Sequence, residues 1–147
     1  MTRFVLDNSV VMRWFTPSSN QSDRHYADRV LESMNESEAV VPGLFYLEAS
    51  NVLICSERRG ETTIAQTEDF TSQLENLPIS VDSSTWRQSF GRTMVLARSY
   101  GLSSYDAAYL ELAVRESLTL ASLDRALIKA AEKAGIGIYL AEEHENA

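Results

Sequence analysis

The feature that most constrains the fold is an unbroken apolar run near the start of the chain that ends in an acidic residue. Phe4, Val5 and Leu6 precede Asp7, and two small polar residues follow before the next apolar stretch. An apolar run without alternation predicts a strand covered on both faces, as in a parallel sheet. In open α/β sheets ligands bind beyond the carboxyl ends of the strands, where Asp7 would lie.

Strand-like and helix-like segments alternate along the whole chain. This alternation predicts right-handed crossovers and an α/β fold, a three-layer α/β/α arrangement with a central, mostly parallel sheet of about five strands. We expect a single domain over residues 1–147, with a frayed acidic tail at residues 142–147. The expected strands cover residues 3–6, 39–41, 79–81, 118–121 and 137–140, and the expected helices cover residues 10–15, 23–34, 42–60, 62–77, 85–100, 105–117 and 124–134, with a polar loop at 18–22.

Length and composition exclude several classes of protein. A chain of 147 residues with 44% hydrophobic and 23% charged residues fits one globular domain. No apolar run approaches the ~20 residues of a membrane helix, and no signal peptide is evident, so we expect a cytoplasmic protein without membrane contact. A single cysteine, Cys55, excludes an intramolecular disulfide and fits a reducing compartment.

The formal net charge of −8 has the wrong sign for simple binding to nucleic acid, which depends on Lys and Arg. Three explanations remain open. Nucleic acid is not the ligand, or bound cations neutralise part of the acidity, or a basic segment of a partner does so.

Four carboxylates are candidates for a functional site: Asp7, Glu48, Asp106 and Asp124. Asp7 and Asp124 each follow an expected strand, and the other two lie on expected helices. Three of them also have purely structural interpretations. Asp7 and Asp124 could be N-caps, and Asp106 lies three residues after Ser103, the spacing of a capping box.

Glu48 differs from the others because its helical neighbours offer no cation. The residues three and four positions away are Leu44, Phe45, Asn51 and Val52. Burying an unpaired charge costs several kcal/mol. Glu48 should therefore be protonated, paired through the tertiary fold, or bound to a metal.

If the four carboxylates meet at one edge of the sheet, they repel one another. At ~4 Å and an effective dielectric near 20, each pair costs about 4 kcal/mol. Mg²⁺ or Mn²⁺ would relieve this repulsion, because both prefer oxygen ligands. Asn8, Ser9 and Ser122 would supply supporting hydroxyl or amide groups. Zinc sites, catalytic triads and phosphate-binding glycine motifs find no support in the pattern.

Four segments together resemble one known family. They are residues 5–9 (VLDNS), 42–53 (PGLFYLEASNVL), 101–113 (GLSSYDAAYLELA) and 120–127 (LASLDRAL). In this order and spacing, over nearly the whole chain, they resemble a PIN-domain ribonuclease, and within that superfamily the VapC-type toxin of bacterial toxin–antitoxin pairs. The family's acidic residues carry over to Asp7, Glu48, Asp106 and Asp124. Its small polar residue corresponds to Ser9, and Ser122 stands where many members have Thr.

The resemblance implies endonucleolytic cleavage of RNA with Mg²⁺ or Mn²⁺, a homodimer, and inhibition by a cognate antitoxin whose tail lies near the active site. Two alternatives remain open at this point: a PIN nuclease of RNA processing without an antitoxin, and a non-catalytic interaction module of the same fold. Candidates for phosphate contacts are Arg13, or Arg87, Arg92 and Arg98 on one expected helix.

Overall fold

The computed structural model describes residues 2–16 and 20–141. The expected frayed tail at residues 142–147 and part of the expected loop at 18–22 lie outside the described residues. The helices are α1 (Asn8–Phe15), α2 (Gln21–Ser33), α3 (Phe45–Arg58), α4 (Ile64–Glu75), α5 (Thr85–Gln88), α6 (Arg92–Tyr100), α7 (Ser104–Glu116) and α8 (Arg125–Lys133). None of these described helices combines the length and apolar character that a membrane crossing requires.

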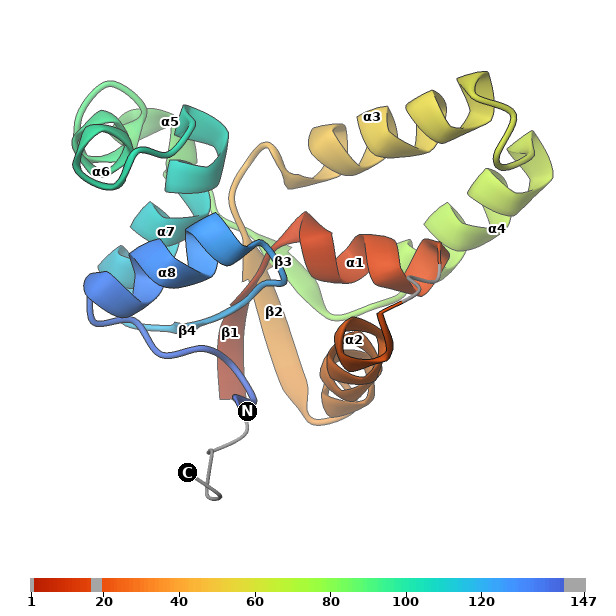
Figure 1. Ribbon diagram of the computed structural model, residues 1–147, viewed down its shortest axis with the longest axis horizontal. Helices are drawn as coiled ribbons and strands as arrows, with labels where there is room; N and C mark the ends of the chain where they lie inside the picture. Colours follow the sequence, from red (N-terminus) through yellow and green to blue (C-terminus); the bar gives the residue numbers. More distant parts are fainter. Residues whose placement is uncertain (1, 17–19, 142–147) are drawn as a thin grey trace.

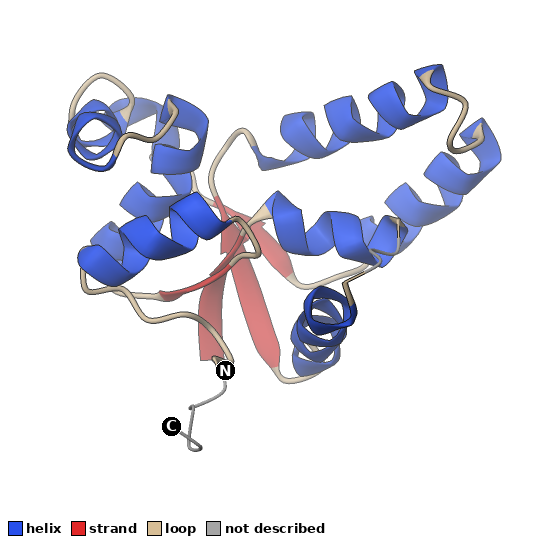
Figure 2. Cartoon of the chain, viewed as in Figure 1, coloured by secondary structure: helices blue, strands red, loops and turns tan. Residues whose placement is uncertain are grey.

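A parallel sheet forms the centre of the molecule, as predicted (Figures 1 and 2). Its strands are β1 (Thr2–Leu6), β2 (Ser37–Val41), β3 (Ile79–Val81) and β4 (Thr119–Ala121), in the order β3-β2-β1-β4. All three pairings are parallel. In Figure 1 helices α1 to α4 lie to the right of β1, and helices α5 to α8 lie to its left.

The core explains why the first strand is entirely apolar. Phe4, Val5 and Leu6 are all fully buried, with helices packed around the strand. The ring of Tyr139 stacks on Phe4 with centroids 3.9 Å apart. Helix α7 contacts β1, β4 and α8, and every residue from 107 to 113 on it is buried.

Two expected elements differ from the sequence prediction. The segment at residues 137–140 makes only an isolated parallel bridge, Leu120 with Ile138, so the described sheet has four strands and not about five. The chain turns away directly afterwards, with Leu140 at a positive φ of 54°.

The expected helix at residues 85–100 is two helices, α5 and α6. Between them Gly91 takes φ −109° and ψ −105°, which is not a helical conformation. Gly tolerates such angles because it has no Cβ. As a result Arg87 lies on α5, whereas Arg92 and Arg98 lie on α6, so the expectation that one helix carries all three arginines is wrong.

Candidate active site at the carboxyl edge of the sheet

The sequence order of the strands reverses at β1, which has β2 on one side and β4 on the other. Such a reversal opens a crevice at the carboxyl ends of the strands, where α/β proteins bind ligands. Asp7 follows β1 directly, and Ser122 follows β4 directly. The Asp7 backbone N–H donates to the Ala121 carbonyl at 3.0 Å, so the two strand ends stay paired as they enter this crevice.

Asp7 is a buried carboxylate held by two hydroxyl groups. Only 6% of the residue is exposed. Its Oδ2 accepts hydrogen bonds from Ser9 Oγ at 2.6 Å and from Ser122 Oγ at 2.9 Å. It occupies the N-cap position of α1, but its side chain makes no capping bond, so the structural interpretation as a cap is wrong.

The two serines are themselves fixed by backbone groups. Ser9 Oγ accepts a hydrogen bond from the Leu123 N–H at 2.8 Å, and Ser122 Oγ accepts one from the Asp124 N–H at 3.0 Å. Each hydroxyl therefore directs its own proton at Asp7. These two bonds set the orientation of the carboxylate before any ligand arrives.

The electrostatic state of Asp7 reflects its surroundings. Burial raises its pKa from 3.8 to about 6, the hydrogen bonds from the two serines lower it, and the negative charges of Asp106 and Asp124 raise it. A carboxyl group that titrates close to neutral pH is ready to gain from a nearby positive charge.

Glu48 lies on α3 and is half-buried. Its Oε1 accepts a hydrogen bond from Tyr109 Oη at 2.6 Å and a longer one from Asn8 Nδ2 at 3.4 Å. Burial raises the pKa of Glu48, with a smaller rise from the charge of Asp106. Glu48 is thus paired through the tertiary fold, which is one of the three outcomes predicted from the sequence. Its partners are the neutral side chains of Tyr109 and Asn8.

Asp106 and Asp124 both sit at the start of helices. Ser103 caps α7 by accepting a bond from the Asp106 backbone N–H at 3.1 Å, which does not use the Asp106 carboxylate. Asp124 does cap α8, because its Oδ1 accepts bonds from the N–H groups of Ala126 and Leu127 at 3.0 and 3.2 Å. Both of those bonds use Oδ1, so Oδ2 takes no part in the cap.

The four carboxylates form one electrostatic group. Burial raises the pKa of Asp106, and the charge of Asp124 raises it further, while Asp106 in turn raises the pKa values of both Asp7 and Glu48. Within residues 2–16 and 20–141, no Lys or Arg forms an ion pair with any of the four. No direct ion pair therefore offsets the repulsion between them in this part of the chain.

The donor set fits a hard divalent cation in kind, because all of its atoms are carboxylate, hydroxyl or amide oxygens. Among the described residues, however, no three His, Cys, Asp or Glu side chains come close enough to hold one metal ion together in this conformation. Mg²⁺ keeps several of its waters and needs only one or two direct carboxylates. The residues therefore fit an ion that some of them contact directly and others reach through water.

Two hollows adjoin the carboxylates. The first is lined by Asn8, Ser9, Met12, Arg13, Asp23, Val52 and Leu123. The second is lined by Leu44, Leu47, Glu48, Asn51, Val52 and Tyr105. Of the arginines considered from the sequence, Arg13 lies beside the site, whereas Arg87, Arg92 and Arg98 are exposed and line neither hollow.

Tyr109 is the member of this arrangement that the sequence did not identify. It lies on the apolar side of α7, is fully buried, and looks from the pattern like an ordinary core residue. Burial, and then its hydrogen bond to Glu48, raise the pKa of the hydroxyl. The hydroxyl therefore stays protonated and acts as a donor. Its spacing of three residues from Asp106 was the only available signal.

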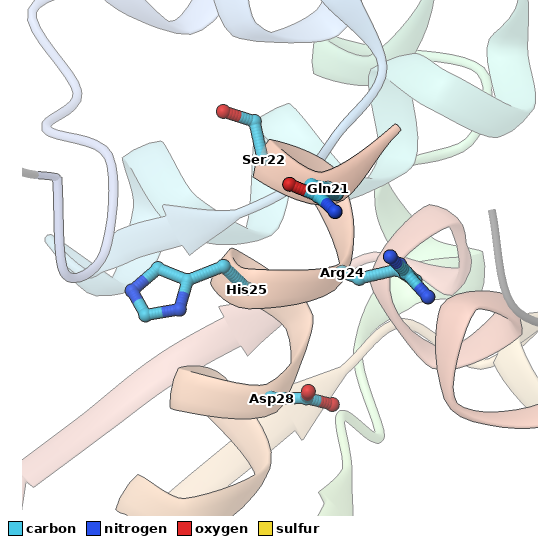
Figure 3. Close-up of a pocket in the computed structure, with 5 residues that line it drawn as sticks. All are labelled: Gln21, Ser22, Arg24, His25 and Asp28. Carbon is cyan, nitrogen blue, oxygen red and sulfur yellow. The ribbon is translucent and has the colours of Figure 1, made fainter. Parts of the chain in front are cut away.

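A further hollow on α2 lies outside this arrangement. It is lined by Gln21, Ser22, Arg24, His25 and Asp28, all from one helix (Figure 3). In Figure 3 His25 points to one side of the helix, whereas Arg24 and Asp28 point to the other. These groups do not converge on a common point, so they do not form a catalytic site.

Comparisons with known proteins agree with this fold. The chain matches the family model "PIN domain" over residues 4–133. It is similar to the crystal structure of PAE2754 from Pyrobaculum aerophilum, with 22% identity, a TM-score of 0.64, and coverage of 88% of this chain and 86% of that one.

It is also similar to the crystal structure of FitAcB from Neisseria gonorrhoeae, with 16% identity, a TM-score of 0.61, and coverage of 92% of this chain and 96% of that one. At these identities the two likenesses establish a shared fold. A search among curated proteins gave no significant match.

Proposed function

We propose that this chain, which belongs to the PIN-domain family, is a Mg²⁺- or Mn²⁺-dependent endoribonuclease and the toxin of a VapC-type toxin–antitoxin pair. PIN domains are generally nucleases. The finer assignment to RNA and to a toxin rests on the sequence resemblance and on the chemistry of the carboxylate site.

The observation that carries the proposal is the state of Asp7. A carboxylate that is 6% exposed and close to two other acids is costly to keep ionised, and the hydrogen bonds from two serine hydroxyls offset only part of this cost. Among the described residues no Lys or Arg forms an ion pair with it. A bound divalent cation would remove this cost, so that ion binding would be correspondingly more favourable.

In the proposed site Asp7, Glu48 and Asp106 hold the ion, directly or through water, and Asp124 completes the group or orients the attacking water. Ser9 and Ser122 orient Asp7 through their hydrogen bonds. A bound Mg²⁺ or Mn²⁺ supplies Lewis acidity toward a phosphate oxygen and makes a water molecule easier to deprotonate.

The protein's own contribution to substrate binding lies in the hollow beside Asn8 and Ser9. Arg13 lines this hollow and would contact a phosphate that flanks the scissile bond. No other Lys or Arg of the described residues lines either hollow, and the net charge of −8 opposes the binding of phosphates. We therefore expect RNA affinity to depend strongly on the divalent cation.

The proposed partners follow from two further features. Leu47, Trp86 and Phe90 are 76%, 70% and 93% exposed, an unusual degree for large apolar side chains, and a second copy of the chain would cover them in the proposed homodimer. The acidic site would attract the basic tail of the proposed antitoxin.

The test is RNA cleavage by the purified protein with Mg²⁺ or Mn²⁺, with EDTA, and in the variant Asp7→Asn. The matched control is Asp69→Asn, which makes the same change on the exposed face of α4. We expect EDTA and Asp7→Asn to abolish cleavage and Asp69→Asn to preserve it. Undiminished cleavage in EDTA or by Asp7→Asn would overturn the assignment.

The toxin role has its own test. Expression of the wild type should arrest growth, and expression of Asp7→Asn should not. Cleavage by the purified protein without growth arrest would leave an RNA-processing nuclease in place of a toxin.

A further inference from the structure

The hydroxyl group of Tyr109 joins three elements at the edge of the candidate site. Tyr109 lies on α7, one turn after Asp106, and is fully buried. Its Oη donates to Glu48 Oε1 on α3 at 2.6 Å and accepts from Asn8 Nδ2 on α1 at 3.2 Å. The hydroxyl therefore acts both as a donor and as an acceptor.

Asn8 closes this arrangement from the other side. Its Nδ2 lies 3.0 Å from the Phe45 carbonyl in the first turn of α3 and 3.4 Å from Glu48 Oε1, so its two hydrogens are shared among these two acceptors and Tyr109 Oη. Asn8 is 8% exposed, so these bonds form away from solvent. The Glu48 carboxylate is thus held through Oε1, by a short hydrogen bond from Tyr109 and a longer, shared contact with Asn8.

The hydrogen bonds of Glu48 tie helix α3 to α7 and α1 at the edge of the site. In Figure 1 helix α3 runs outward from the sheet to a loop that joins it to α4, and the inner ends of the two helices lie apart. Asp7 directly follows strand β1 and Asp106 lies on the buried helix α7, whereas Glu48 lies in the first turn of α3 and meets α7 and α1 through its carboxylate.

We propose that Tyr109 is a positioning residue for metal binding: its hydrogen bond fixes Glu48 Oε1 and leaves Oε2 as the oxygen that would bind the ion. This inference rests on the proposed function, because it assigns Glu48 a part in binding the ion. A buried tyrosine hydroxyl with a purely structural role needs a hydrogen-bond partner, but that partner need not be the carboxylate of a candidate metal ligand.

The test compares Mn²⁺ binding by variants that keep the ring and lose the hydroxyl. Tyr109→Phe removes the donor to Glu48. The matched control is Tyr139→Phe, because Tyr139 is also buried, at 6% exposed, and its hydroxyl donates to Ser33 Oγ at 2.9 Å, a contact that involves none of the site residues. Free Mn²⁺ is followed by its electron paramagnetic resonance signal, so the readout does not depend on RNA cleavage.

We expect Tyr109→Phe to weaken Mn²⁺ binding about 10-fold or more, the size of effect seen when groups that orient metal ligands are removed. Tyr139→Phe should bind like the wild type. In the Glu48→Gln background, Tyr109→Phe should cause little further loss, since its effect passes through Glu48.

Each other outcome has a distinct meaning. If the wild type binds no Mn²⁺, the proposed function fails, and this inference fails with it. If the wild type binds and Tyr109→Phe binds equally well, only the positioning role is overturned. Equal losses in the wild-type and Glu48→Gln backgrounds would also overturn it, because they would indicate a general structural effect.

Circular dichroism and thermal melting without metal establish that each variant is folded. Should Tyr109→Phe fail to fold, Glu48→Gln tests the same contact from its other end, because it keeps the Tyr109 hydroxyl and removes the carboxylate that this hydroxyl orients. Unchanged Mn²⁺ affinity in Glu48→Gln would overturn the proposal, because Glu48 would then take no part in binding the ion.

Discussion

Replacing Asp7 with Asn should stabilise the metal-free protein at neutral pH and abolish its stabilisation by metal. The pKa of Asp7 rises from 3.8 to about 6 on folding. Keeping the group ionised in the folded state therefore costs about 3 kcal/mol above pH 6, at roughly 1.4 kcal/mol for each pKa unit. Asn removes this cost.

The net gain should be smaller than the full cost. The amide oxygen of Asn can still accept from Ser9 and Ser122, but its NH2 group is a new buried donor, and a buried donor without a partner costs about 1–2 kcal/mol. We expect a net gain of about 1–2 kcal/mol at pH 8, which corresponds to a rise in Tm of about 3–6 °C for a domain of this size.

The pH dependence follows from the direction of the shift. Between pH 4 and 6 the folded wild type keeps a proton on Asp7 that the unfolded chain has released. Wild-type stability therefore falls as the pH rises through this window. Below it Asp7 is neutral in both states, so the advantage of Asp7→Asn should disappear near pH 4.

The assay is urea unfolding followed by circular dichroism at pH 4 and pH 8 in EDTA, and again at pH 8 with Mn²⁺. Mn²⁺ at ~100 times its Kd should add about 2.7 kcal/mol to the wild type and little to Asp7→Asn. Asp69→Asn controls for the loss of one negative charge. Clear destabilisation of Asp7→Asn at pH 8 in EDTA would refute this reasoning, because it would mean that the charge stabilises the fold.

Two further predictions concern Arg115 and Ser122. Arg115→Met should lower the unfolding free energy by about 3–5 kcal/mol, because Arg115 forms ion pairs with Glu111 at 2.8 Å and with Asp82 at 2.7 Å, and Glu111 is only 1% exposed. Urea unfolding measures this change, and a loss below about 1 kcal/mol would contradict the prediction. Ser122→Ala should raise the pKa of Asp7 further and shift the acidic limb of the pH–rate profile of RNA cleavage upward by about 0.5–1 unit, whereas an unchanged or lowered limb would refute the role of this hydroxyl.

Local sequence patterns predicted most of the fold, because they follow from chain chemistry. The apolar run Phe4–Leu6 allowed only a strand covered on both faces, and it is fully buried in the parallel sheet. The N-cap at Asp124 was a direct reading of side-chain chemistry at a helix start, and the structure confirms it.

What the sequence could not predict depends on contacts between distant segments. From the sequence, Asp7 suited a role as the N-cap of α1 as well as a role in a metal site. Only the approach of Ser122, which follows β4, gives its carboxylate a different partner. Tyr109 has the appearance of a core residue until α3 brings Glu48 to its hydroxyl. The break at Gly91 was missed because a single glycine is tolerated within a helical pattern.

The central claim is that these carboxylates bind a divalent cation, and calorimetric titration of Mn²⁺ into the metal-free protein tests it most directly. Asp106 is the group whose charge raises the pKa values of both Asp7 and Glu48. We predict saturable binding by the wild type and binding at least ~10-fold weaker by Asp106→Asn. A wild type that binds no Mn²⁺, or an Asp106→Asn variant that binds as tightly as the wild type, would contradict the account.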